Sequence, residues 1–116
     1  MLNPSCLFCK IIQKTIKSTI IQENDWIIAI QDIAPKAPTH YLLLPKKHVE
    51  NVLYLTDEDE VYSWQMMKMA RDLGKQLPSQ NFNMISNNGA GAGQSVFHWH
   101  IHFLAGRNLY EHGLKL

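Results

Sequence analysis

The sequence predicts an α+β domain in which an antiparallel sheet packs around one amphipathic helix. Three observations carry this prediction: short β-branched or apolar runs bounded by turn signals, one stretch with clear helical periodicity, and short connections between them. Several strands around one such helix are typical of this fold class. The 116 residues are the size of a single domain, 1–116, and contain no internal repeat, low-complexity segment or linker.

Three strands are predicted in the first half of the chain. The β-branched runs at 19–22 and 26–32 are separated by polar residues, and they form a predicted hairpin. Two prolines in the segment 34–38 remove backbone donors and break regular structure. The apolar run 39–45 then reads as a buried strand that Pro45 ends.

The clearest helix is predicted between Thr56 and Pro78. Thr56 is a suitable N-cap with Asp59 three residues later. The acidic residues after Thr56 are favourable near the positive end of the helix dipole. Pro78 ends the helix. Apolar residues recur at steps of three and four, which predicts a single core-facing stripe. Its members are Val61, Trp64, Met67, Ala70, Leu73 and Leu77.

The last third of the chain holds the most informative pattern. A short strand at 82–86 and a glycine-rich loop at 87–94 precede the run "VFHWHIHFL" at 96–104. Because side chains alternate along a strand, its three histidines are predicted to share one face. The opposite face is predicted to pack on the core. The histidines are His98, His100 and His102, and the core-facing residues are Phe97, Trp99, Ile101 and Phe103.

Two kinds of chemistry suit three imidazoles on one face. They can hold a catalytic zinc with one open position, or they can form a nucleophilic site that receives an anion. In the second case mutual repulsion keeps at least one ring neutral near pH 7, and a neutral imidazole is a competent nucleophile. Gly89, Gly91 and Gly93 let the backbone approach a phosphate, although a flexible turn explains these glycines equally well. The loop favours the phosphate site.

Composition excludes several partners. The net charge is +1 and the basic residues are scattered, which argues against a nucleic-acid surface. No apolar run approaches the roughly 18 residues of a membrane-spanning helix, so no membrane partner is expected. The first residues lack the pattern of a signal peptide. The two cysteines, spaced C-x-x-C, suggest a reducing compartment with a metal or redox role. A cytoplasmic location is the expectation.

The run "HWHIHFL" fits the H-φ-H-φ-H-φ-φ motif, with φ apolar, of the histidine triad (HIT) superfamily. The blocks "DIAPKAPTHYLLLPKKHV" and "GQSVFHWHIHFLAGR" resemble its Hint branch, the nucleoside phosphoramidases, and the resemblance extends from Cys6 to about Arg107. It implies a sheet of about five strands with one long and one short helix. It also implies a homodimer and a purine nucleotide substrate.

The resemblance implies roles for four histidines. His100 takes the place of the nucleophile that attacks the α-phosphate, forming a covalent nucleotidyl-histidine and then releasing AMP or GMP. The backbone carbonyl of His98 would fix the tautomer of His100. His102 would hydrogen-bond the phosphate, and His40 would help position the triad.

The resemblance also implies a nucleotide-binding set. Asp32 matches the carboxylate that accepts hydrogen bonds from both ribose hydroxyls. Ile33 and Ile30 would line the base pocket, where many relatives carry an aromatic residue in place of Ile30. The positions that contact ribose, phosphate and leaving group are matched by Asn87, Gln94 and Ser95.

A structural zinc is the remaining implication. Cys6, Cys9, His48 and His98 match the four zinc ligands of many bacterial relatives, and two thiolates with two imidazoles make a closed tetrahedral set. His98 would then give its side chain to the metal and its carbonyl to His100. A redox dithiol and two thiols without metal are the alternatives.

Other functions stay open on the sequence alone. Hydrolysis of dinucleoside polyphosphates would use the same pocket, and a regulatory module would bind nucleotide with little turnover. The ending "EHGLKL" departs from the tryptophan-containing ending of several relatives, so the leaving group is the least determined feature.

Overall fold

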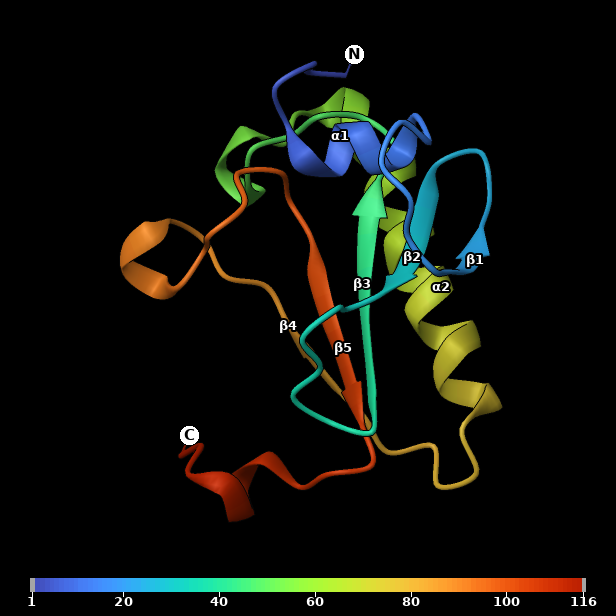
Figure 1. Cartoon of the computed structure of the whole chain (residues 1–116), viewed down its shortest axis with the longest axis vertical. Coiled ribbons are helices and arrows are strands. Elements are labelled where there is room, and N and C mark those ends of the chain that lie inside the picture. Colours follow the sequence, from blue (N-terminus) through green and yellow to red (C-terminus); the bar gives the residue numbers. More distant parts are fainter. Residues whose placement is uncertain (1, 116) are drawn as a thin grey trace.

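The computed structural model describes residues 2–115, and over these residues the chain forms one five-stranded antiparallel sheet (Figure 1). The strands are β1 (Ile20–Glu23), β2 (Ile27–Gln31), β3 (Thr39–Pro45), β4 (Asn83–Ile85) and β5 (Ile101–Ala105). Their order in the sheet is β1-β2-β3-β5-β4. The predicted fold class and number of strands are confirmed.

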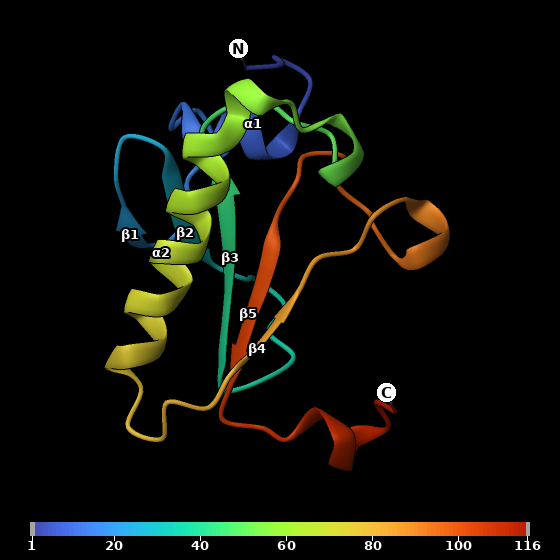
Figure 2. The same cartoon turned by 180° about the vertical axis from the view of Figure 1, so that it is seen from behind.

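Two α-helices lie on opposite faces of this sheet. The long helix α2 (Glu60–Gln76) packs across β2 and β3, in front of the sheet in Figure 2. The short helix α1 (Leu7–Ile12) covers the other face near the end of β3. Ile27 and Ala29 face the core cluster under α2, whereas Ile28 and Ile30 pack with Phe8 of α1. Both faces of β2 are therefore buried, which explains its continuous apolar run.

The face of α2 that packs on the sheet differs from the predicted apolar stripe. Met66 and Met69 are buried against the sheet, together with the predicted Ala70 and Leu73. Trp64, however, is 57% exposed and Met67 39% exposed, and Val61 is exposed as well. The stripe was wrong in its first half because the helix carries apolar residues on two adjacent faces. Periodicity finds both faces, and only packing on β2 and β3 selects one.

The predicted capping by Thr56 and Asp59 is present, but it caps a 3₁₀ turn that precedes α2. The backbone N–H of Thr56 donates to Asp59 Oδ2 at 2.9 Å, and Asp59 itself is buried and paired with Lys47. The first turn, Asp57–Asp59, is a 3₁₀ turn that leads into α2. This capping anchors the helix over the sheet.

The adjacent residues Met66 and Met67 allow a test of which face of α2 is buried. We expect Met66→Ala to lower the free energy of unfolding by about 2–5 kcal/mol, because this side chain is fully buried. Met67→Ala removes the same atoms from a side chain that is 39% exposed, and it should cost less than about 1 kcal/mol. Urea denaturation of both variants measures the difference. Equal costs would contradict the observed orientation of α2.

The strand of the three histidines is shorter than predicted. Regular pairing of β5 begins at Ile101, and residues 96–100 approach it outside the sheet, with bends at 96–98. The reason is a hydrogen bond outside the sheet, since the Trp99 N–H donates to the Val49 carbonyl at 2.6 Å. Trp99, Ile101 and Phe103 lie in the core as predicted. Phe97 does not, because it lies in the bend at 96–98 and is 46% exposed.

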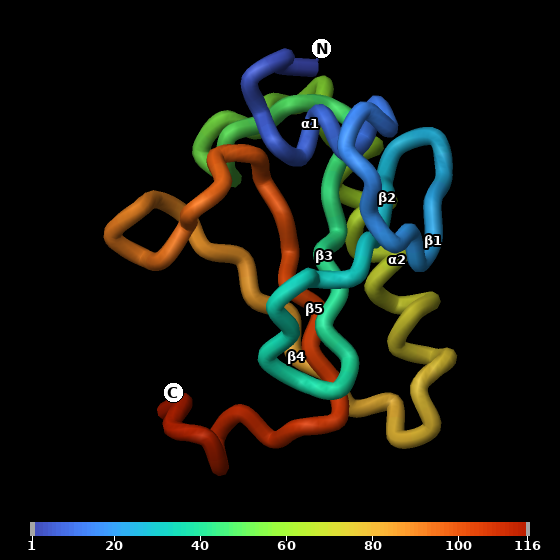
Figure 3. The backbone as a smooth tube through the Cα atoms, in the orientation of Figure 1, coloured from blue at the N-terminus to red at the C-terminus, as the bar shows by residue number. Residues whose placement is uncertain are grey.

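Two segments extend away from the sheet on its β4 side. These are the glycine-rich loop before β5 and the chain after β5, and the smooth trace in Figure 3 shows both. Within residues 2–115, the longest helix is too short and too polar to cross a lipid bilayer.

Candidate active site and metal centre

His98 lies at the junction of two sites. Its ring is completely buried, and Nε2 lies 2.9 Å from the carbonyl oxygen of Pro45. A carbonyl only accepts, so Nε2 carries the proton and donates. The lone pair is then on Nδ1, which lies 3.4 Å from Cys6 Sγ and 3.5 Å from Cys9 Sγ. The end of β3 thus fixes the tautomer that can bind a metal beside the two sulfurs.

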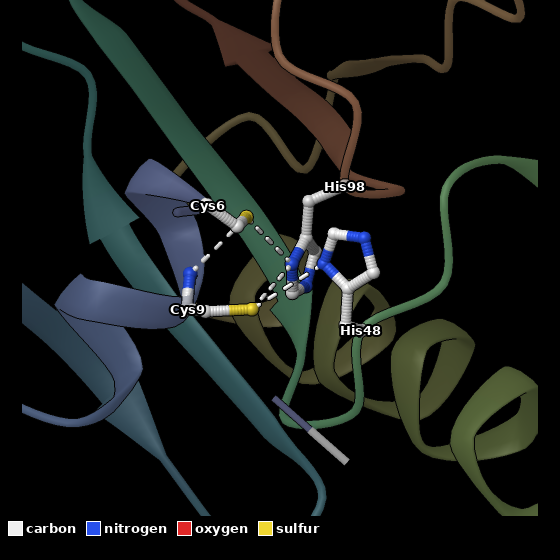
Figure 4. Close-up of side chains that lie close together, drawn as sticks. All are labelled: Cys6, Cys9, His48 and His98. Carbon is white, nitrogen blue, oxygen red and sulfur yellow. Dashed lines mark hydrogen bonds between the residues drawn. The ribbon is translucent and has the colours of Figure 1, made fainter. Parts of the chain in front are cut away.

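Four side chains from three parts of the chain converge at this point (Figure 4). Cys6 is the N-cap of α1 and Cys9 lies within that helix, while His48 follows β3. His48 Nδ1 lies 3.3 Å from Cys9 Sγ, and all four ligand atoms lie within 4.8 Å of one another. A tetrahedral zinc at ordinary bond lengths would have sulfur–nitrogen edges of about 3.5 Å. The observed separations match this, so the donor set fits a structural zinc.

Burial has a further effect on this cluster. It raises the pKa of the Cys9 thiol to about 11, against the smaller opposing effect of a hydrogen bond from the Asn3 backbone. Without a metal, Cys9 is therefore protonated at neutral pH. A metal that binds here must displace this proton.

His100 has its tautomer fixed by the backbone. Its Nδ1 lies 2.7 Å from the carbonyl oxygen of His98, so Nδ1 carries the proton and Nε2 keeps the lone pair. The ring is 6% exposed and meets the edge of Phe8 at a centroid distance of 5.0 Å. Burial lowers the pKa of His100, although its bond to the His98 carbonyl opposes this. Among residues 2–115, no hydrogen bond engages Nε2, so the structure presents a neutral imidazole with an available lone pair.

A chain of hydrogen bonds sets the tautomer of His102. The Lys36 backbone N–H donates to His40 Nδ1 at 3.0 Å, so the proton of neutral His40 lies on Nε2. That nitrogen is 2.9 Å from His102 Nδ1 and donates to it. His102 consequently carries its proton on Nε2. Because no side chain of Lys36 is involved, the sequence contained no signal for its part in the site.

Asp32, His40 and His102 form a second group of possible metal ligands. The hydrogen bond from Lys36 argues against that use. If His40 bound a metal through Nε2, its Nδ1 would carry the proton and would face the Lys36 N–H, leaving two donors opposed. We interpret this group as a hydrogen-bonded relay that orients His102.

The three triad histidines do not converge on one point. Within the described part of the chain, no set of neighbouring ligand atoms contains all three. His98 turns toward the cysteines, whereas the ring of His100 lies 5.1 Å from that of His102. The geometry therefore does not favour a catalytic zinc held by the triad.

The residues expected around ribose and base are only partly accessible. Asp32 Oδ1 accepts from the Ala34 N–H at 2.7 Å, and Oδ2 lies 3.4 Å from His40 Nε2. Its side chain is 17% exposed. Ile33 is 97% exposed, whereas Ile30 is buried under α1 at 2%. Only Ile33 offers surface to a base without rearrangement, and the place of Ile30 in a base pocket stays a prediction.

The expected phosphate and leaving-group contacts differ in their surroundings. Asn87 is half-buried and Ser95 is exposed. Gln94 is 3% exposed, and its amide bonds within the protein. The structure therefore brings the histidines, Asp32 and the cysteines together closely, but it leaves the contacts of these three residues to nucleotide as predictions.

The histidine relay leads to a prediction about acid stability. Burial, with His100 and His40 nearby, lowers the pKa of His102 to about 4, below the ordinary value of about 6.5. Between these values the unfolded chain binds the additional proton. The contribution of His102 to stability is thus complete above about pH 6.5 and falls as the pH drops toward 4, by up to about 1.4 kcal/mol per pH unit.

Urea denaturation from pH 7.5 to 4.5 measures this dependence. His102→Asn should flatten the loss of stability with falling pH, because the two proteins differ only in the titrating ring. His112→Asn, at an exposed histidine outside the site, is the control. An unchanged slope in His102→Asn would contradict the expected titration.

Comparisons with known proteins find relatives of the same family and the same fold. The HIT domain model matches residues 13–109. Among curated proteins, the chain is 40% identical over 101 residues to Protein hit of Bacillus subtilis, covering 86% of this chain and 70% of that protein. It is 38% identical over 102 residues to an uncharacterised HIT-like protein of Synechocystis, covering 87% and 90%.

Solved structures agree with these matches. A HIT family hydrolase from Clostridium thermocellum superposes with a TM-score of 0.89 at 36% identity, covering 98% of both chains. A histidine triad nucleotide-binding protein from Candida albicans superposes with a TM-score of 0.81 at 30% identity, covering 90% of this chain and 76% of that one.

The antiparallel sheet with histidines leading into its β5 strand defines a protein of the histidine triad class. The chain belongs to the HIT family.

Proposed function

We propose that this protein is a purine nucleoside phosphoramidase that cleaves a P–N bond and releases AMP or GMP. The observation that carries the proposal is the fixed tautomer of His100. Its Nδ1–H is held by the His98 carbonyl at 2.7 Å, so the Nε2 lone pair is available for attack on phosphorus. The hydrolase relatives support this reaction class.

The reaction would proceed in two displacements. His100 Nε2 forms a bond to the α-phosphorus while the P–N bond breaks, and the amine leaves after taking up a proton. Water then attacks the same phosphorus, the P–Nε2 bond breaks, and the nucleoside monophosphate is released. His102, with its proton on Nε2, would donate to a phosphate oxygen as charge develops. His40 would keep His102 in that tautomer.

The nucleotide would be bound by residues around this centre. Asp32 would accept from the ribose hydroxyls, Ile33 and Ile30 would contact the base, and Asn87 and Ser95 would contact ribose, phosphate or leaving group. The similarity to a nucleotide-binding protein of the same family supports a nucleotide ligand. A base docking on Ile33 would cover a side chain that is now almost fully exposed.

The quartet of Cys6, Cys9, His48 and His98 would hold a structural zinc. Bound there, zinc would crosslink α1, the end of β3 and the approach to β5. The chain's own contribution is the Pro45 carbonyl, which keeps the Nδ1 lone pair of His98 turned toward the sulfurs. The backbone carbonyl of His98 would remain available to accept from His100 Nδ1.

A homodimer in the cytoplasm completes the proposal. The exposed face of α2 carries Val61, Trp64 and Met67, and β4 is an edge strand of the sheet. Large apolar side chains on one helix face suit a partner of the same kind. Gel filtration with light scattering should give twice the mass of one chain, and Trp64→Asp should shift the protein toward the monomer.

Turnover of paired substrates tests the reaction. We expect release of AMP from an adenosine phosphoramidate to be faster than from a diadenosine polyphosphate. The reverse preference would favour a dinucleoside polyphosphate hydrolase. Tight AMP binding without turnover, even at high protein concentration, would favour a regulatory module and overturn the proposal.

A further inference from the structure

We propose that Gln94 is a positioning residue that connects the glycine-rich loop to the chain beyond His48 and does not itself contact the nucleotide. This differs from the role that the family resemblance implies. The catalytic consequence rests on the proposed function, whereas the structural part of the inference stands without it.

The amide of Gln94 has no donor left for a ligand. Its Nε2 donates to the Glu50 carbonyl at 2.8 Å and to the Val96 carbonyl at 3.1 Å. A primary amide has two N–H groups, so both are used. The remaining acceptor capacity of Oε1 is unsuited to an ionised phosphate oxygen, because both atoms accept hydrogen bonds and neither donates one. The side chain is also 3% exposed.

The same side chain closes the glycine-rich loop. The Gly89 N–H donates to Gln94 Oε1 at 2.8 Å, and the Gln94 N–H donates back to the Gly89 carbonyl at 3.1 Å. Gly89 adopts a φ of +93°, in the region that favours glycine. This reciprocal pair joins the first glycine of the loop to its last residue. The Gly89 N–H is consequently also occupied and is not a phosphate donor.

The loop is attached to the segment that follows the metal ligand His48. Gln94 bonds to Glu50, and Asn88 Oδ1 accepts from the Val52 N–H at 3.1 Å. The approach to β5 is attached to the same segment through the bond from Trp99 to Val49. One short stretch of chain, 49–52, therefore holds both the loop and the segment that carries His98 and His100.

These hydrogen bonds of Gln94 hold Ser95 in position beside the histidine segment. Gln94 precedes Ser95, and the Gln94 amide bonds to the carbonyl of Val96, which follows it. Within residues 2–115, neither the N–H nor the hydroxyl of Ser95 has a hydrogen-bond partner. Ser95 is exposed and offers two donors beside the histidine segment. The bonds of Gln94 on both sides fix the backbone that presents them.

Gln94→Ala tests the inference by hydrogen exchange and by kinetics. We expect the Gly89 amide to exchange at least about 10-fold faster, because its acceptor is lost. We expect kcat for adenosine phosphoramidates to fall about 10- to 100-fold with little change in KM, since misplaced donors act mainly in the transition state. A positioning role predicts the same factor for substrates with different leaving amines.

Gln94→Glu is the second variant, because it keeps the acceptor for Gly89 but loses both N–H donors. It should also lower kcat, since a carboxylate would face the Glu50 and Val96 carbonyls. Gln76→Ala, at an exposed glutamine that ends α2, is the control and should change neither measurement.

The outcomes separate this inference from the proposed function. Unchanged Gly89 exchange in Gln94→Ala would overturn the connecting role, whatever the activity. A kcat loss that depends on the leaving amine, or a loss of AMP affinity alone, would show direct contact and would also overturn it. If the wild-type protein turns over no phosphoramidate, the proposed function fails while the exchange experiment still decides the role of Gln94.

Discussion

His100→Ala is expected to reduce phosphoramidate turnover by at least about a thousandfold and to abolish formation of a covalent nucleotidyl-enzyme. The reason is that Nε2 of this ring is the atom proposed to bond to phosphorus, and removing it leaves no covalent route. Quenching wild-type protein with radiolabelled substrate and mapping the labelled peptide measures the intermediate directly. The label should be on His100.

The control for this experiment is His112→Ala, which removes an exposed histidine outside the site. It should retain wild-type turnover and labelling. His100→Ala should still bind AMP within a few-fold of wild type, because the ring is not proposed to bind ribose or base. Turnover that survives in His100→Ala, or a label on another residue, would end the assignment of the nucleophile.

Loss of the metal is expected to have the largest effect on stability. Removing zinc with a chelator, or substituting Cys9→Ser, should lower the free energy of unfolding by roughly 4 kcal/mol when free zinc exceeds its Kd about a thousandfold. The physical reason is that the four proposed ligands come from α1, the end of β3 and the approach to β5, so a zinc bound there would link segments distant in sequence.

Metal analysis and thermal melts measure this effect together. Wild-type protein should contain about one zinc per chain, and Cys9→Ser should contain much less. Adding chelator to Cys9→Ser is the internal control, because it should cause no further loss of stability. If zinc content is unchanged in a Cys6→Ser, Cys9→Ser double variant, the metal lies elsewhere and the quartet is not its site.

Much of the fold was predictable because local pattern and tertiary context agree. The β-branched hairpin, the apolar run before Pro45 and the capped helix each adopt the expected structure. The prediction of the buried helix face failed, because two adjacent faces of α2 fit the helical spacing of apolar residues equally well. On α2 both Met66 and Met67 have helical neighbours at suitable spacing, and only the sheet decides which is buried.

The candidate site was likewise predictable only in part. The histidine spacing and the C-x-x-C pair identified the three triad histidines and the two thiols, whereas His40 and His48 were expected only from the family resemblance. The His98 carbonyl was expected from the family resemblance to fix the tautomer of His100, and it lies where expected. The Pro45 carbonyl and the Lys36 N–H were not identifiable, because they are backbone atoms. The backbone is the same at every residue, so no amino-acid type marks these positions.

The sequence by itself determined which chemical groups this protein has and that they belong to a histidine triad domain. Only the tertiary structure decided which nitrogens of His98, His40 and His102 keep their lone pairs, and that the Gln94 amide bonds to the carbonyls of Glu50 and Val96. The physical reason is that side-chain identity is encoded residue by residue. Tautomers and hydrogen-bond partners depend on which backbone atoms, distant in sequence, the folded chain brings within about 3 Å.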